Sequence, residues 1–166
     1  MGNVKEIIQS LLKTETTTQK KENIYTYLVT KEEKQNFAVP IDFIVEVFEI
    51  NENNPLIPLP LVDNYIRGIV NVRGEIIPVI SLNTILELPT DHSKIQYILI
   101  IKKDFQLGLA IHQVNELYQI EESKLKPIYH TKEKKHENII VAEFDIDNDV
   151  AQVIDIESLY ESPLIR

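Results

Sequence analysis

Few side chains in this sequence have the types and spacing that catalysis or metal binding requires. The histidines are His92, His112, His130 and His136, and no two are three or four residues apart on a predicted helix. None lies next to the carboxylates that would complete a metal site. We interpret all four as solvated or loop residues.

The acidic residues Asp145, Asp147 and Asp149 have the spacing that opens a calcium-binding loop. Such a loop continues with a glycine and ends with a bidentate glutamate, but this chain has Val150 and Ile156 at those positions. A β-turn with three solvated carboxylates is the better interpretation.

Nucleophilic and phosphate-binding motifs are also missing from the sequence. The chain has no cysteine and four glycines, at positions 2, 68, 74 and 108, so a glycine-rich phosphate loop cannot be built. No G-x-S-x-G sequence is present. We therefore expect no catalytic residues, no cofactor and no metal, and the protein is not expected to be an enzyme.

Charge and hydropathy narrow the class of partner. The net charge is -9 with a pI near 4.9, whereas nucleic acids and anionic membranes attract basic surfaces. No apolar stretch reaches the roughly 18 residues of a membrane span, and residues 1–6 do not resemble a signal peptide. We expect no nucleic-acid partner, no membrane insertion and a cytoplasmic location, which also fits the missing cysteines.

The elements that would position a site are strands. From residue 24 onward, short runs rich in Val, Ile, Tyr and Phe alternate with polar breaks, which is typical of an all-β chain. Short helical pieces are expected at 82–87 and 156–160. The predicted strands are 24–30, 35–40, 44–50, 66–73, 75–81, 95–102, 106–111, 114–120, 138–145 and 149–155.

Residues 1–22 differ from the rest of the chain. Val4, Ile7, Ile8, Leu11 and Leu12 have the spacing of one helix face. The polar stretch that follows them has the composition of a linker. This segment is either a short amphipathic helix that docks on the body or a partner, or a frayed tail.

An internal repeat organises residues 23–160. Residues 24–50 align on 94–120 without a gap, and a further shift of four residues aligns 66–85 on 140–159. Each repeat is short for an independent core, so two would pack together. We expect a first five-stranded barrel near 24–90 and a second near 94–160.

The repeat also pairs individual residues. Tyr27 falls on Tyr97, and Glu46 falls on Glu116. Matching glutamates could suggest a paired-carboxylate site, but nothing else in the sequence supports one. We interpret the pair as a duplicated structural position.

One segment resembles a known family. Residues 68–82 read G-I-V-N-V-R-G-E-I-I-P-V-I-S-L, a strand, a tight turn and a return strand. This resembles the signature of CheW-like domains, and the order and spacing of the surrounding strands agree over about residues 24–160. The second half departs from the family pattern, which often has extra glycines near residues 142–145.

The resemblance implies a fold of two five-stranded SH3-like barrels packed together, with short helices. It implies a chemotaxis adaptor that binds the regulatory domain of a CheA-type histidine kinase and the cytoplasmic tip of methyl-accepting chemoreceptors. A coupler of another motility or type IV pilus signalling array is the alternative. A third possible function is that of a small enzyme or a ligand-binding barrel, which the absence of catalytic motifs from the sequence disfavours.

The resemblance also implies protein-binding residues. Glu46 and Arg73 are expected to form a partly exposed ion pair near the receptor-facing surface, and Asn71 and Gly74 belong to the same motif. The apolar groove that would receive the receptor is expected to include Ile41, Ile44, Val47 and Leu109.

Overall fold

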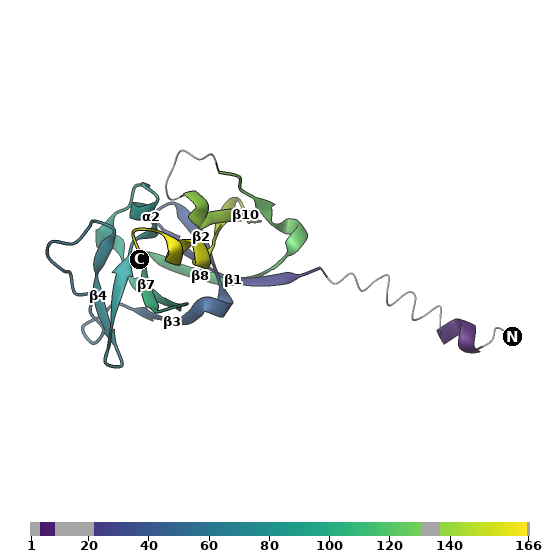
Figure 1. Cartoon of the computed structure of the whole chain (residues 1–166), viewed down its shortest axis with the longest axis horizontal. Helices are drawn as coiled ribbons and strands as arrows, with labels where there is room; N and C mark the ends of the chain where they lie inside the picture. The colour runs from purple at the N-terminus through teal and green to yellow at the C-terminus, as the bar shows by residue number, and fades with distance from the viewer. Residues whose placement is uncertain (1–3, 9–21, 131–136, 166) are drawn as a thin grey trace.

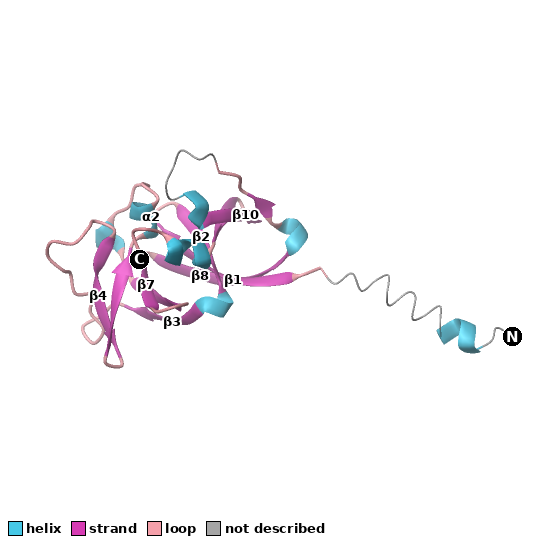
Figure 2. Cartoon of the chain, in the orientation of Figure 1, coloured by secondary structure: helices cyan, strands magenta, loops and turns pink. Residues whose placement is uncertain are grey.

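The computed structural model describes residues 4–8, 22–130 and 137–165, and most of the described chain is strand (Figure 2). The strands are β1 (Ile24–Glu32), β2 (Gln35–Pro40), β3 (Ile44–Glu49), β4 (Ile66–Val72), β5 (Glu75–Ile80), β6 (Tyr97–Lys102), β7 (Gln106–Ile111), β8 (Gln113–Glu121), β9 (Lys126–Pro127), β10 (Ile140–Ile146) and β11 (Asp149–Ile154). The helical elements are α2 (Leu82–Ile85), α3 (Ile156–Glu161) and the 3-10 turns η1 (Ile41–Phe43), η2 (His92–Lys94), η3 (Glu122–Lys124) and η4 (Glu137–Ile139). The predicted all-β class is confirmed, and each of the ten predicted strands overlaps an observed strand.

The strands form two curled sheets that lie side by side (Figure 1). The sheet called here barrel A has the order β8-β1-β2-β11-β10-β9, and the sheet called barrel B has the order β3-β6-β7-β5-β4. In each sheet, antiparallel hairpins flank a single parallel pair, β2 with β11 in barrel A and β7 with β5 in barrel B. These are the two expected SH3-like barrels.

The predicted division into a barrel at 24–90 and a barrel at 94–160 is wrong. Hairpin β1–β2 lies in barrel A beside strands from the second half of the chain, and hairpin β6–β7 lies in barrel B beside strands from the first half. The two repeats have therefore exchanged hairpins. Local sequence patterns cannot reveal this exchange, because a hairpin has the same apolar alternation whichever barrel receives it.

The internal repeat itself is present in the strand pairing. The bulged pairs Ile66↔Ile80 and Gly68↔Val79 of barrel B have counterparts in barrel A at the same shift of 74 residues, Ile140↔Ile154 and Ala142↔Val153. The parallel pair Val79↔Gly108 likewise corresponds to Val153↔Ala38. Under the repeat, β3, β6, β7, β5 and β4 become β8, β1, β2, β11 and β10, which is the strand order of barrel A.

One part of the alignment is displaced by a residue. Val29 pairs with Ala38 in barrel A, and Ile100 pairs with Gly108 in barrel B. Since Ala38 and Gly108 are equivalent, Val29 matches Ile100, and Tyr27 matches Ile98 instead of Tyr97. Between these equivalent residues, the second hairpin (100–108) has one residue fewer than the first (29–38), which the ungapped alignment could not accommodate.

The core has three parts. One apolar cluster fills barrel A around Phe144, another fills barrel B around Ile98, and the largest lies between the barrels. This shared cluster takes side chains from both sheets, including Phe37 of β2, Leu99 of β6 and Leu109 of β7. The barrels are therefore joined by a common core as well as by the exchanged hairpins.

The helix predicted near the N-terminus is described only in part. Residues 4–8 are helical, and Val4, Ile7 and Ile8 are exposed. Leu11, Leu12 and most of the predicted linker lie outside the described residues.

Candidate protein-binding surface

The hairpin β4–β5 carries the central motif. Val72 pairs with Glu75, which leaves Arg73 and Gly74 as a two-residue loop. Their φ angles are 50° and 86°, as the mirror-image turns of tight hairpins require at both positions. The Gly74 amide donates a hydrogen bond of 3.0 Å to Asn71 Oδ1. Asn71 and Gly74 thus hold the turn that presents Arg73.

The expected ion pair is present at this turn. Arg73 Nη2 lies 2.7 Å from Glu46 Oε1, and Nη1 lies 3.4 Å from Oε2, so the guanidinium faces both carboxylate oxygens. The side chains of Arg73 and Glu46 are 73% and 28% exposed, respectively. The pair links β3 to the β4–β5 hairpin, and β3 and β4 are the two edge strands of barrel B. It closes the gap between those edges with a charged contact open to solvent.

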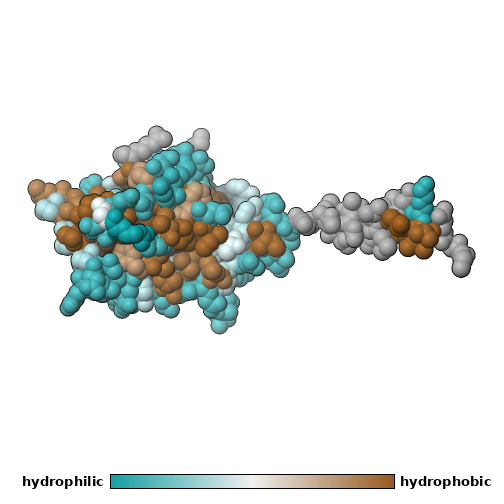
Figure 3. Space-filling view, turned by 90° about the horizontal axis from the view of Figure 1, so that it is seen from below, coloured by the Kyte–Doolittle hydropathy of each residue, from teal (hydrophilic) through white to brown (hydrophobic). Residues whose placement is uncertain are grey.

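Apolar side chains flank the ion pair along the chain. Ile41 in η1 is 37% exposed, Val47 on β3 is 40% exposed, and Ile44 is half-buried against the shared core. Val45, which sequence reasoning did not select, is also exposed. Figure 3, which views the molecule from below Figure 1, shows that apolar surface gathers on the body on this side.

Leu109 does not belong to this surface, so its predicted place in the groove is wrong. Its side chain is 2% exposed and packs in the shared core. β7 lies between β6 and β5, and five of its six residues are buried. An alternating pattern alone could not show that both faces of this strand are covered.

A second apolar surface lies on the loop before β4 and was missed from the sequence. Ile57, Leu59, Leu61 and Val62 are exposed, Leu61 completely and with a φ of 58°.

This loop is held against β4 by Gly68. Ile57 and Ile69 exchange two backbone hydrogen bonds of 2.9 Å. A Cβ atom on Gly68 would lie 2.2 Å from the Ile57 carbonyl oxygen, and Gly68 has a φ of 140°. A glycine is therefore required where the loop crosses the strand.

A buried carboxyl group joins the two barrels. Glu32, at the end of β1 in barrel A, is 2% exposed. Ser81 Oγ donates to it at 2.8 Å and the Asn83 amide at 3.3 Å, both from the segment that follows β5 of barrel B. Burial raises the pKa of Glu32, while these hydrogen bonds act in the opposite direction. This role could not be predicted from the sequence, because a glutamate beside a turn is usually solvated.

In the parts of the chain that the structure describes, no three His, Asp or Glu side chains gather as they would around a metal ion. His112 is used structurally, since its Nδ1 accepts a hydrogen bond of 2.9 Å from the Glu33 amide, and burial lowers its pKa. Within the described residues, no helix is both long enough and apolar enough to span a bilayer.

Known proteins resemble this chain in sequence. The chemotaxis protein CheW of Thermotoga maritima is 31% identical over 94 residues, which are 56% of this chain and 60% of the relative. The chemotaxis protein CheW of Bacillus subtilis is 35% identical over 72 residues, 41% of this chain and 45% of the relative. The matched segments thus span about half of these relatives' lengths.

The fold is shared with a solved structure. The crystal structure of the scaffolding protein TtCheW from Thermoanaerobacter tengcongensis superposes with a TM-score of 0.70 and 22% identity, covering 85% of this chain and 95% of that one. In addition, the family model for the CheW-like domain matches residues 26–163. This range contains every strand except the first two residues of β1, and the chain therefore belongs to the CheW-like domain family.

Proposed function

We propose that this chain is a non-catalytic chemotaxis adaptor that couples chemoreceptors to a CheA-type histidine kinase. The observation that carries the proposal is the CheW-like match over both barrels, residues 26–163. The relatives named chemotaxis protein CheW support the same role. The described residues offer surfaces for binding and no constellation for catalysis.

The receptor-facing surface in this proposal is the strip around β3. It combines the exposed apolar side chains of Ile41 and Val47 with the ion pair of Glu46 and Arg73. An apolar centre with a charged rim is the usual composition of a protein interface. A helical receptor tip would place apolar side chains on the strip and polar side chains against the ion pair.

The kinase partner is the regulatory domain of a CheA-type kinase, and the adaptor acts in the cytoplasm. In barrel A, the hairpin turn at 147–148 is exposed and lies outside the receptor strip. An adaptor needs two such separate surfaces, because it must hold receptor and kinase at once.

Calorimetric titration of the whole chain with a receptor-tip fragment and with a CheA regulatory domain tests the proposal. Both should bind. Val47→Asp should weaken receptor binding by roughly tenfold, since a charge would be buried in the apolar centre of the interface. Ile24→Asp, which changes another exposed apolar residue at the start of β1, is the matched control and should bind like the wild type. Failure of both partners to bind would contradict the adaptor role.

A further inference from the structure

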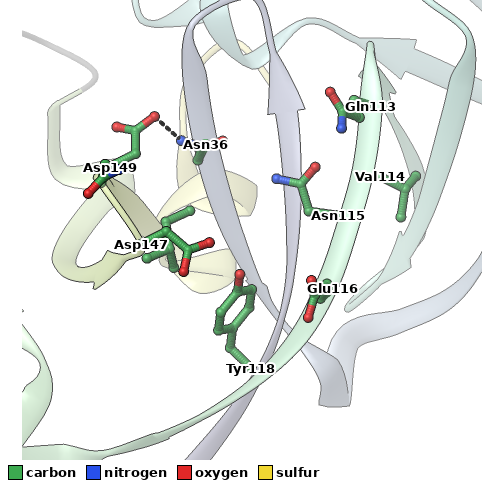
Figure 4. A pocket seen from close by; sticks show the side chains of 10 residues that line it. Asn36, Gln113, Val114, Asn115, Glu116, Tyr118, Asp147 and Asp149 are labelled. Atoms are coloured by element: carbon green, nitrogen blue, oxygen red, sulfur yellow. Dashed lines mark hydrogen bonds between the residues drawn. The ribbon is translucent and has the colours of Figure 1, made fainter.

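A polar cleft opens in barrel A between β8 and the β10–β11 hairpin. Its volume is about 610 Å³, and its lining includes Asn36, Asn115, Glu116, Tyr118, Asp147 and Asp149. Figure 4 shows the Tyr118 ring between Asp147 and Glu116, with Asn115 directed toward the same space. The receptor strip around β3 contributes nothing to this lining.

The internal repeat identifies what this cleft corresponds to in barrel B. Val47 pairs with Leu99 and Leu117 pairs with Leu28, so β8 matches β3 at a shift of 70 residues. Glu116 is therefore the counterpart of Glu46. Glu46 is the residue that binds Arg73 in barrel B.

The hairpin turns match as well. The shift of 74 residues that relates β4–β5 to β10–β11 places Asp147 on the position of Arg73. The backbone agrees, since φ is 50° at Arg73 and 48° at Asp147. Barrel B thus has a carboxylate and a guanidinium across its gap, whereas barrel A has two carboxylates at the same two positions.

Within the described residues, neither carboxylate has a partner. Glu116 and Asp147 are exposed and take part in no hydrogen bond or ion pair there. Asp149 is different, because its carboxylate accepts hydrogen bonds from Asn36 Nδ2 at 2.9 Å and from the Val150 amide at 2.8 Å. Asp149 therefore shapes the cleft, and Glu116 and Asp147 are left to meet a ligand.

The negative charges of the two carboxylates act on Tyr118 inside the cleft. Burial and the negative charges of Glu116 and Asp147 raise the pKa of Tyr118. An aromatic ring beside carboxylates suits a planar cation, which can stack on the ring and donate to the oxygens. The described residues do not provide the grouping of ligands that a metal ion requires.

We propose that this cleft binds an arginine side chain of a partner protein, held between Glu116 and Asp147 as Arg73 is held by Glu46 in barrel B. The inference goes beyond the proposed function and does not depend on which protein supplies the arginine. The guanidinium fits because its fork of donors matches a carboxylate in two places, as the Arg73 pair shows.

The test is an NMR titration of the isotopically labelled whole chain with N-acetyl-arginine methylamide. The citrulline analogue, which has nearly the same shape and no charge, is the ligand control. The arginine probe should shift amide signals of residues 113–118 and 146–149, and the citrulline probe should not. Glu116→Gln and Asp147→Asn should each weaken binding by roughly fivefold, the upper range for one exposed ion pair. Glu52→Gln removes an exposed charge from the loop before β4 and should leave binding unchanged.

Asp147→Arg gives an independent test, because Arg73 already occupies the same backbone conformation. The introduced arginine should pair with Glu116 and abolish binding of the probe. The proposal is overturned if arginine and citrulline act alike, if the arginine shifts fall elsewhere or are absent, or if Asp147→Arg binds the probe as the wild type does. The spectrum of each of the four variants also reports whether that variant is folded.

Discussion

At the scale of single residues, removing the Glu46–Arg73 pair should affect partner binding more than the stability of the fold. The pair is solvent-exposed, so its loss should cost only about 0–1 kcal/mol of unfolding free energy. Arg73→Ala should therefore melt almost like the wild type, yet bind the receptor-tip fragment or the kinase domain more weakly because Glu46 is left unpaired at the interface. Thermal melts and calorimetry measure the two effects.

Lys34→Ala is the matched control for Arg73→Ala, since Lys34 is an exposed cation at another hairpin turn. It should change neither property. If Arg73→Ala unfolds the chain, Arg73 is a structural residue. If Arg73→Ala folds and binds both partners as strongly as the wild type does, Arg73 has no role in binding.

Glu32 predicts a pH dependence of stability. Its pKa in the folded chain is raised above the ordinary value of 4.5 by burial. Between 4.5 and the folded pKa, the folded chain binds more protons than the unfolded chain, so the unfolding free energy falls as pH rises through this window and levels off above it. Glu32→Gln keeps an acceptor for Ser81 and Asn83 but does not titrate, so it should gain stability relative to the wild type from pH 4 to pH 7.

Urea unfolding of both proteins at pH 4, 5, 6 and 7 measures this difference. Glu33→Gln is the control, because Glu33 is the neighbouring carboxylate and lies less deeply buried. If the unfolding free energies of the wild type and Glu32→Gln differ by the same amount at all four pH values, Glu32 has the same pKa in the folded and unfolded chains and the prediction is wrong.

The residue-level predictions succeeded where a motif fixed the geometry. The resemblance of the N-x-R-G turn and of Glu46 to the CheW-like pattern predicted the ion pair, and the two-residue turn presents Arg73 beside Glu46. The prediction for Leu109 was wrong, and Glu32 was not singled out, for the opposite reason. Their burial depends on strands more than 25 positions away in the sequence, and no local pattern reports it.

At the scale of elements, strand positions were predictable to within a few residues because turn residues bound each apolar run. β9 was missed, since Lys126–Pro127 is two residues long and has no apolar run. The short helix α2 was placed correctly but ends earlier than the predicted 82–87.

The N-terminal segment gives a prediction at this scale. Residues 1–22 should be dispensable for folding of the two barrels, because Val4, Ile7 and Ile8 are exposed and Glu22 accepts an exposed hydrogen bond from the Ser123 amide. A chain that begins at Asn23 should melt within about 5 °C of the full chain, which corresponds to roughly 1–2 kcal/mol for a protein of this size. A larger drop would mean that the segment packs as part of the core.

At the scale of the whole molecule, the exchange of hairpins is the main feature that the sequence could not predict. The repeat was visible because equivalent strands keep the same alternation of apolar residues. Which barrel each hairpin joins is decided by the connections β2–η1–β3 and β7–β8, which lead the chain from one sheet into the other. The result is two barrels with a shared core, suited to hold two binding surfaces in a fixed relation.

The adaptor role requires that this chain bridge a receptor and a kinase. Size-exclusion chromatography of a receptor-tip fragment and a CheA-type kinase, with and without the full-length chain, measures this bridging. Receptor and kinase should elute together in larger amount when the chain is present, and all three proteins should be found in that peak. If the chain elutes alone and the receptor and kinase elute as they do without it, the adaptor function is contradicted.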